Sequence, residues 1–168
     1  YNESDNIAKI IEKIGFFDVD ILVVDDNSPD NTSSIVKKLM SSNQRIDILE
    51  RPKKLGLGSA YRDGFKYSID KGYNILIQMD ADFSHRIDDL KNMINFIDDF
   101  EVIIGSRYIS GGGSMGWSSL RKNLSKFANI YARIITGTKV HDMTSGFRIY
   151  SSDALEKIDY SKTTSDGY

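Results

Sequence analysis

The stretch "ILVVDDNSPD", residues 21–30, decides the fold class. Its four leading apolar residues, rich in β-branched side chains, predict a buried parallel strand. The Asn-Ser-Pro turn that follows ends this strand. Asp25 and Asp26 therefore stand at a strand's carboxyl end, which is where open α/β sheets bind their ligands. Two carboxylates there are compatible with a nucleotide pocket, a phosphoacceptor site with its metal, or a merely polar strand end.

The rest of the chain alternates between helical and strand patterns. Further strands are predicted at 46–49, 75–79 and 102–104, and helical spacing covers 5–14, 30–40, 56–69, 87–100 and 120–135. This alternation predicts an α/β fold with a mostly parallel central sheet flanked by helices. A helix comes first, whereas a β-α-β arrangement begins with a strand. We therefore expect residues 1–168 to be a single domain truncated at the amino end, where the first strand is missing, and at the carboxyl end.

The composition is that of an ordinary globular domain. The chain has 168 residues, of which 40% are hydrophobic and 27% charged, which is enough for one domain with its own core. It contains no cysteine, which excludes a disulfide scaffold and thiolate metal sites.

The net charge of −2 conceals an uneven distribution of charge. Residues 102–141 contain no Asp or Glu but six basic residues, whereas residues 1–101 carry 19 acidic and 13 basic residues. This asymmetry predicts an anionic partner for the basic segment. Nucleic acid is not expected, because the overall charge is negative and no recognition motif accompanies the basic residues.

The helix predicted over 120–135 is both basic and amphipathic. Such a helix can lie on a membrane surface. More often an apolar stripe of this kind packs against the core, and that is the outcome the pattern favours here.

A second acidic motif, "QMDADFSH" at residues 78–85, also follows a buried strand. Asp80 and Asp82 can point two carboxylates at one cation from the turn after that strand. Hard oxygen ligands of this kind suit Mg²⁺ or Mn²⁺, which usually retain waters and bridge to substrate phosphates. An Asp-x-Asp pair alone is a weak signal, but its place beside Asp25 and Asp26 strengthens it.

Other α/β classes fit the motifs less well. A phosphorylatable receiver domain has a similar acidic pair after its first strand, but it follows its acceptor with a Met-Pro turn, where this chain has residues 83–86, Phe-Ser-His-Arg. The late Lys-Pro of receivers is absent, since the only prolines are Pro29 and Pro52. Phosphatases of the haloacid dehalogenase type carry their acidic motifs in the reverse order. The glycine pattern at Gly56 and Gly58 fails the dinucleotide-binding spacing at Tyr61.

Seven motifs together resemble the family 2 glycosyltransferases of the GT-A fold, closest to the branch of dolichol-phosphate or polyprenol-phosphate mannose synthases. In chain order they are YNE, VVDDNSPDNT, GLGSAYRDGF, QMDADFSH, GSRY, GGGSMGWSSLRK and DMTSGFRIY. The resemblance covers almost the whole chain. It implies an inverting, metal-dependent transferase that moves mannose from GDP-mannose onto dolichyl or polyprenyl phosphate. A UDP-sugar donor, as in a polyprenyl-phosphate glucosyltransferase, is the close alternative, and a receiver-like phosphoacceptor domain is the alternative from another class.

The resemblance also implies roles for residues of the donor site. Tyr1, Glu3 and Asp26 would line the nucleotide pocket, with Asp26 on the base and Asp25 supporting the turn. Asp80 and Asp82 would bind the donor through Mg²⁺ or Mn²⁺, with Ser84 as a weaker third ligand.

The acceptor would be a phosphate monoester, which is already ionised near neutral pH and needs cations rather than a general base. Arg107 and Arg121 fit that task, with Lys122 assisting, because arginine matches phosphate oxygens in pairs. Asp82, Arg107 and Arg121 are therefore the expected catalytic residues. Asp142 and His85 are expected to organise the site. The expected location is the cytoplasmic side of a membrane, bound peripherally or anchored through segments absent from this chain.

Overall fold

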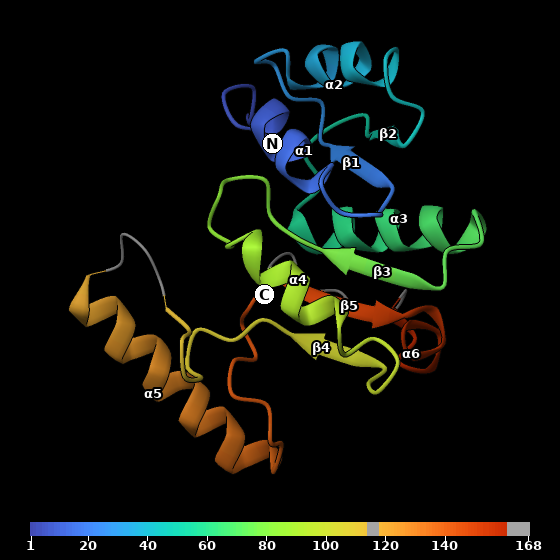
Figure 1. Ribbon diagram of the computed structural model, residues 1–168. Helices are drawn as coiled ribbons and strands as arrows, with labels where there is room; N and C mark the ends of the chain where they lie inside the picture. Colours follow the sequence, from blue (N-terminus) through green and yellow to red (C-terminus); the bar gives the residue numbers. More distant parts are fainter. Residues whose placement is uncertain (114–117, 161–168) are drawn as a thin grey trace.

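The computed structural model describes residues 1–113 and 118–160, which form an α/β arrangement of six helices and five strands (Figure 1). Trp117 and the final Asp166-Gly167-Tyr168 motif lie outside the described residues. The elements are α1 (Ile7–Ile14), β1 (Ile21–Asp25), α2 (Thr32–Met40), β2 (Ile46–Glu50), α3 (Leu57–Asp70), β3 (Ile75–Gln78), α4 (Asp88–Ile94), β4 (Val102–Ile104), α5 (Ser119–Thr136), β5 (Arg148–Ser151) and α6 (Ser152–Lys157).

The strands form two small sheets. In the first, β1 and β2 are parallel, with Ile21 opposite Ile46 and Asp25 opposite Glu50. In the second, β5 lies between β3 and β4 and runs antiparallel to both. The expectation of one mostly parallel sheet is thus met only in part: the α/β class holds, but the second sheet pairs through an antiparallel strand that the apolar pattern did not predict.

The parallel strands nevertheless bring the predicted motifs to one edge of the fold. The arrows of β1, β3 and β4 point the same way in Figure 1. The residues that follow these strands, Asp26, Asp80 and Arg107, therefore lie on the same side of the molecule. This is the arrangement that the sequence predicted for a ligand site.

Three apolar clusters hold the body together. One joins α1 and α2 to the first sheet around Ile11, Val36 and Ile46. The second joins α4 to β5 and the preceding loop around Leu90 and Phe147, and the third joins α3 and α6 to β3 and β5. Helix α4 is shorter than predicted: after Ile94 the chain continues in turns with i to i+3 hydrogen bonds.

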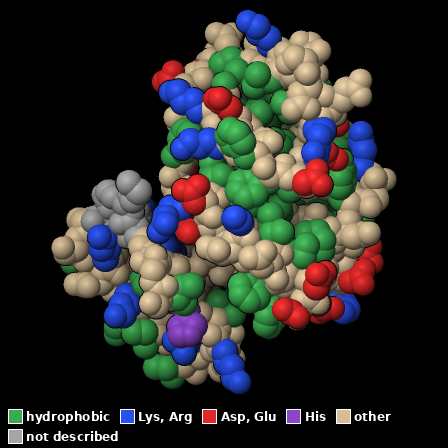
Figure 2. Space-filling view, in the orientation of Figure 1, with side chains coloured by type: hydrophobic (Ala, Val, Ile, Leu, Met, Phe, Trp, Pro, Cys, Tyr) green, Lys and Arg blue, Asp and Glu red, His purple; other side chains and the backbone are tan. Residues whose placement is uncertain are grey.

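Helix α5 extends away from the body, at the lower left of Figure 1. Its apolar side chains are exposed, with Leu124 at 67% and Phe127 at 68%, whereas Asn129 on the opposite side of the helix is 3% exposed. The expectation that the stripe packs on the core is therefore wrong. The polar side faces the protein, where Ser125 accepts a hydrogen bond from the Tyr108 hydroxyl at 2.6 Å. Figure 2 shows hydrophobic and basic side chains together on the surface of this lobe.

Candidate active site

The turn after β1 is built on Asp25. Its carboxylate is buried and accepts hydrogen bonds from the Ser28 backbone N–H at 3.0 Å and the Ser28 hydroxyl at 2.6 Å. Asn27, which lies between Asp25 and Ser28 in the sequence, adopts a φ of 57°, a left-handed conformation that asparagine tolerates well in turns. Asp25 therefore supports the turn, as the sequence predicted.

Asp26 is engaged by a buried arginine. Arg51 Nη1 lies 2.9 Å from Asp26 Oδ1, as a charge contact rather than an aligned hydrogen bond, and the Leu55 N–H reaches the other oxygen at 3.3 Å. Arg51 is itself buried and also contacts Asp63 at 3.0 Å. The strand register explains the pair. Asp25 and Glu50 lie opposite each other at the ends of β1 and β2, so the residues that follow them, Asp26 and Arg51, are also neighbours. Sequence reasoning missed Arg51, because the register that places it beside Asp26 depends on how the two strands pair.

The first residues of the chain are fastened to the turn at 28–32. Three backbone N–H groups donate to its side chains: Asn2 to Ser28 Oγ at 3.0 Å, Glu3 to Thr32 Oγ1 at 3.0 Å, and Ser4 to Asp30 Oδ2 at 2.9 Å. Hydrogen bonds from Thr32 and Ser4 hold the pKa of Asp30 well below its usual range. Tyr1 and Glu3 are thereby placed beside the Asp25–Asp26 turn.

Asp80 is oriented by two ring side chains. The Tyr61 hydroxyl donates to Asp80 Oδ1, and His85 Nε2 lies 3.1 Å from Oδ2. The imidazole of His85 stacks on the ring of Phe147, with 5.3 Å between centroids. His85 thus holds the Asp80 carboxylate, which fits its expected organising role.

Asp82 is the more accessible carboxylate of the second motif. It is exposed, and its Oδ1 accepts the backbone N–H of Ser84 at 2.9 Å. The described residues contain no group of three His, Asp or Glu side chains arranged to hold a metal. Two carboxylates still fit Mg²⁺ or Mn²⁺, which retain waters and take further oxygens from a substrate diphosphate. Asp80 and Asp82 therefore remain the candidate ligands, while Ser84 is tied to Asp82 through its backbone.

Some of the predicted donor residues share one cavity. Tyr1, Glu3, Asp80 and Asp82 all line a space of about 1520 Å³, which Asp26 does not border. This volume exceeds the roughly 300–1,000 Å³ of ordinary small-molecule sites. The excess arises because the cavity continues inward between β1 and β3.

Arg107, which is predicted to bind the acceptor phosphate, forms a two-point ion pair with Asp142. Its Nε and Nη2 atoms each lie 2.7 Å from a carboxylate oxygen of Asp142, and Nη2 also donates to the Thr144 hydroxyl at 2.7 Å. Asp142 is fully buried. Burial alone would raise the pKa of its carboxyl, but the hydrogen bonds and charge of Arg107, together with the Thr144 hydroxyl, outweigh burial and lower that pKa. Asp142 thus orients Arg107, which fits its expected organising role.

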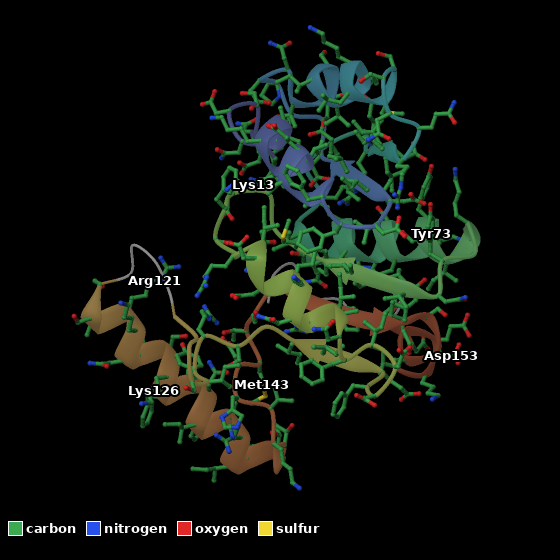
Figure 3. All side chains as sticks on the ribbon, in the orientation of Figure 1. Lys13, Tyr73, Arg121, Lys126, Met143 and Asp153 are labelled. Carbon is green, nitrogen blue, oxygen red and sulfur yellow. The ribbon has the colours of Figure 1, made fainter. Side chains whose placement is uncertain are left out.

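Arg121 and Lys122 lie in the exposed first turn of α5. Figure 3 labels Arg121 at this end of the helix. Ser118 caps this helix, accepting the Arg121 backbone N–H at 3.3 Å. Their position on α5 differs from that of Arg107, which follows β4 in the body of the fold. The predicted acceptor cations therefore come from two separate elements.

Asn129 joins α5 to the loop that carries Asp142, and the sequence reasoning did not identify it. Its side-chain oxygen accepts the Met143 backbone N–H at 2.8 Å, and its amide donates to the Ser125 carbonyl at 3.0 Å. The sequence feature that could have identified Asn129 is a single amide in the middle of the polar side of the helix.

Replacing Asn129 with alanine should lower the free energy of unfolding by about 1–3 kcal/mol, because the Met143 N–H loses its acceptor. Urea denaturation would measure the change. The exposed Lys126 on the same helix provides a matched control, and Lys126→Ala should stay within about 0.5 kcal/mol. Equal effects of the two substitutions would contradict the assigned role of Asn129.

A family model, Glycosyl transferase family 2, matches residues 1–159 of this chain. Among curated proteins, the polyprenol monophosphomannose synthase of Mycolicibacterium smegmatis is 41% identical over 172 residues. The undecaprenyl-phosphate mannosyltransferase of Micrococcus luteus is 35% identical over 170 residues. Both alignments cover 100% of this chain, which spans 65% of the first relative's length and 70% of the second's.

Proposed function

The chain belongs to glycosyl transferase family 2, and on that premise we propose that it transfers mannose from a nucleotide sugar to the phosphate of a polyprenyl phosphate. The observation that carries this proposal is the likeness of the entire chain to two transferases named for that acceptor class and that sugar. Family membership also sets aside the receiver-domain alternative. GDP-mannose is the donor we propose, and a UDP-sugar is the competing donor.

The donor would enter between the two acidic motifs. Tyr1 and Glu3 border the cavity from the amino-terminal segment, and Asp80 and Asp82 border it from the turn after β3. The Asp26 carboxylate would need to contact both Arg51 and the nucleotide base. Otherwise Asp26 would affect base binding only indirectly, by holding the turn after β1 in place. A bound Mg²⁺ or Mn²⁺ on Asp80 and Asp82 would neutralise negative charge on the departing nucleoside diphosphate.

The acceptor phosphate would act as the nucleophile without a protein base. One of its oxygens attacks the anomeric carbon of mannose, the bond from that carbon to the donor diphosphate breaks, and the electron pair leaves with the nucleoside diphosphate. The configuration at the anomeric carbon inverts. Arg107, Arg121 and Lys122 supply the positive charge that holds one anion near another. Asp142 keeps the Arg107 guanidinium in a fixed orientation for this task.

A direct transfer assay tests the proposal. The protein is incubated with Mg²⁺, undecaprenyl phosphate and either GDP-[¹⁴C]mannose or UDP-[¹⁴C]glucose, and label is counted in the organic phase. We expect labelled lipid from GDP-mannose. Label from UDP-glucose alone would replace the donor, and label from neither sugar would overturn the proposed activity.

Helix α5 is the proposed membrane contact. None of the described helices could itself cross a bilayer. The outward apolar side of α5, flanked by Arg121, Lys122 and Lys126, matches a helix that lies in the interface of an anionic membrane. Such a contact would bring the start of α5 close to the phosphate of a lipid acceptor.

The double substitution Leu124→Ser and Phe127→Ser should weaken binding to phosphatidylglycerol-containing vesicles roughly tenfold to hundredfold. The reason is that each buried apolar side chain contributes about 1.5–3 kcal/mol, and interfacial burial is partial. Vesicle co-sedimentation would measure the loss. Phe16, which follows α1 and is 85% exposed, provides the control Phe16→Ser. Unchanged binding of the double variant would exclude α5 as the contact.

A further inference from the structure

The two arginines predicted to bind the acceptor phosphate stand on different elements. Arg107 follows β4, which ends at Ile104, whereas Arg121 lies in the first turn of α5. A phosphate held by both needs their guanidinium groups at a fixed separation, because arginine meets phosphate oxygens through directed, paired hydrogen bonds. The residues around Arg107 contact α5 at two places, and these contacts can be followed atom by atom.

Tyr108 makes the first contact with α5. It follows Arg107 directly in the chain, and its ring packs against the Arg107 guanidinium, with 5.6 Å between Cζ and the ring centroid. This distance is within the range of a cation–π contact. The Tyr108 hydroxyl donates to Ser125 Oγ on α5 at 2.6 Å. One side chain therefore touches both the predicted acceptor arginine and the helix.

Asn129 makes the second contact, through the ion-pair partner of Arg107. Its Oδ1 accepts the backbone N–H of Met143 at 2.8 Å, and Met143 is the residue after Asp142. Arg148 of β5 holds the same loop from the body, since its Nη2 donates to the Met143 carbonyl at 2.6 Å. Figure 3 labels Met143 beside α5. The loop that carries Asp142 is therefore fixed between β5 and α5.

The two contacts and Arg121 follow one another along α5. Residue 125 is four positions after residue 121, and residue 129 is four positions after residue 125, so that successive members are neighbours one turn apart. The Asn129 amide also donates to the Ser125 carbonyl at 3.0 Å, which joins the two contacts. A displacement of α5 would therefore move Arg121 and the contacts that fix Arg107 together.

We propose that Tyr108 and Asn129 are positioning residues that hold the Arg107–Asp142 pair at a fixed place relative to Arg121, so that both arginines meet one acceptor phosphate. This inference rests on the proposed function, because it takes a polyprenyl phosphate as the acceptor. Tyr108 acts through Arg107, and Asn129 acts through Asp142. Both side chains should therefore affect the acceptor and leave the donor unaffected.

Kinetics with each substrate varied in turn tests the proposal. Tyr108→Phe removes the hydroxyl and keeps the ring on Arg107, and Asn129→Ala removes the second contact. Each should raise the KM for undecaprenyl phosphate in detergent micelles roughly threefold to tenfold, which corresponds to the loss of one hydrogen bond. The KM for GDP-mannose should change less than about twofold. Tyr108→Phe alone is sufficient for the test if Asn129→Ala proves too unstable to assay.

Tyr73→Phe is the matched control. It also removes a tyrosine hydroxyl, which donates to Asp20 at 2.6 Å, and Tyr73 lies on the opposite side of the protein from α5 (Figure 3). Both KM values should stay within about twofold of those of the parent protein. If Tyr108→Phe and Asn129→Ala changed no more than this control, or raised both KM values equally, the proposal would be overturned.

The Arg121→Ala background separates positioning from a local effect on Arg107. Once Arg121 is removed, there is no second guanidinium to align, and adding Tyr108→Phe should raise the acceptor KM by less than about twofold. An equal effect of Tyr108→Phe in the parent and in Arg121→Ala would show that Tyr108 acts on Arg107 alone, which would contradict the proposal.

Amide hydrogen exchange measures the contacts without the reaction. The Arg107 backbone N–H donates to Asp142 Oδ2 at 3.1 Å, and its exchange should be at least about threefold faster in Tyr108→Phe and Asn129→Ala than in Tyr73→Phe. Exchange at the parent rate in both variants would overturn the inference even if the transfer reaction is correct. If the parent transferred no mannose, the proposed function would fail, and exchange at Arg107 would still decide whether α5 positions this residue.

Discussion

Replacing Asp82 with alanine is expected to lower kcat/KM for mannose transfer roughly 10³-fold, or about 4 kcal/mol of transition-state stabilisation. Asp82 is exposed, and its carboxylate binds only the Ser84 N–H among the contacts described around it. It is therefore the acidic side chain best placed to bind a metal ion without a rearrangement of the fold. Asp80, by contrast, is already held by Tyr61 and His85.

Asp82→Ala should weaken nucleotide binding without lowering the stability of the fold. Calorimetry with GDP and Mg²⁺ should show loss of the metal-dependent part of nucleotide affinity, while the unfolding midpoint without ligand changes little because the side chain is exposed. Asp98→Ala, at another exposed aspartate after α4, is the matched control and should keep full activity. If Asp82→Ala binds GDP with Mg²⁺ as the parent protein does, Asp82 is not a metal ligand.

The strands were predicted because short apolar runs rich in β-branched residues are typical of strands in α/β folds. Residues 21–24 and 102–104 fall within β1 and β4 of the structure. Strand β5 escaped prediction because it has a polar residue at each end, Arg148 and Ser151, and only two apolar residues between them. Its direction depends on the return path of residues 137–147, which carries no local pattern of its own. That strand turned the predicted parallel sheet into an antiparallel one on its side of the fold.

In the candidate site, too, the sequence predicted which residues follow the strands but not which side chains contact them. The sequence predicted that Asp80 and Asp82 follow a strand, and in the structure both lie in the turn after β3. The partners that orient them could not be predicted, because Tyr61 and His85 meet Asp80 only through the packing of α3 and of the turn after β3. Helix α5 is the clearest case: periodicity defined its apolar stripe, but not which side faces the protein. The buried amide of Asn129 decides that, through its bond to Met143.

The pair formed by Arg107 and Asp142 should respond unequally to the loss of either partner. Breaking a buried ion pair by removing one member typically costs about 3–5 kcal/mol of unfolding free energy. Asp142→Ala should fall near the low end of that range, since the Arg107 side chain is 21% exposed and retains access to water. Arg107→Ala should fall near the high end at neutral pH, because it leaves a fully buried carboxylate without its cation.

The pH dependence of stability should reverse between the parent protein and Arg107→Ala. In the parent, Arg107 lowers the pKa of Asp142, so this contribution is present above the unfolded value of about 3.9 and is lost as pH falls through the folded pKa. Without Arg107, burial dominates and raises that pKa, so Asp142 becomes protonated more readily and the variant should be more stable at pH 5 than at pH 8. Urea denaturation of the parent, Arg107→Ala and Asp142→Ala at both pH values would measure this. A destabilisation of Arg107→Ala that is equal at the two pH values would show that Asp142 reaches water once Arg107 is removed, and that the ion pair is not what holds the carboxylate ionised.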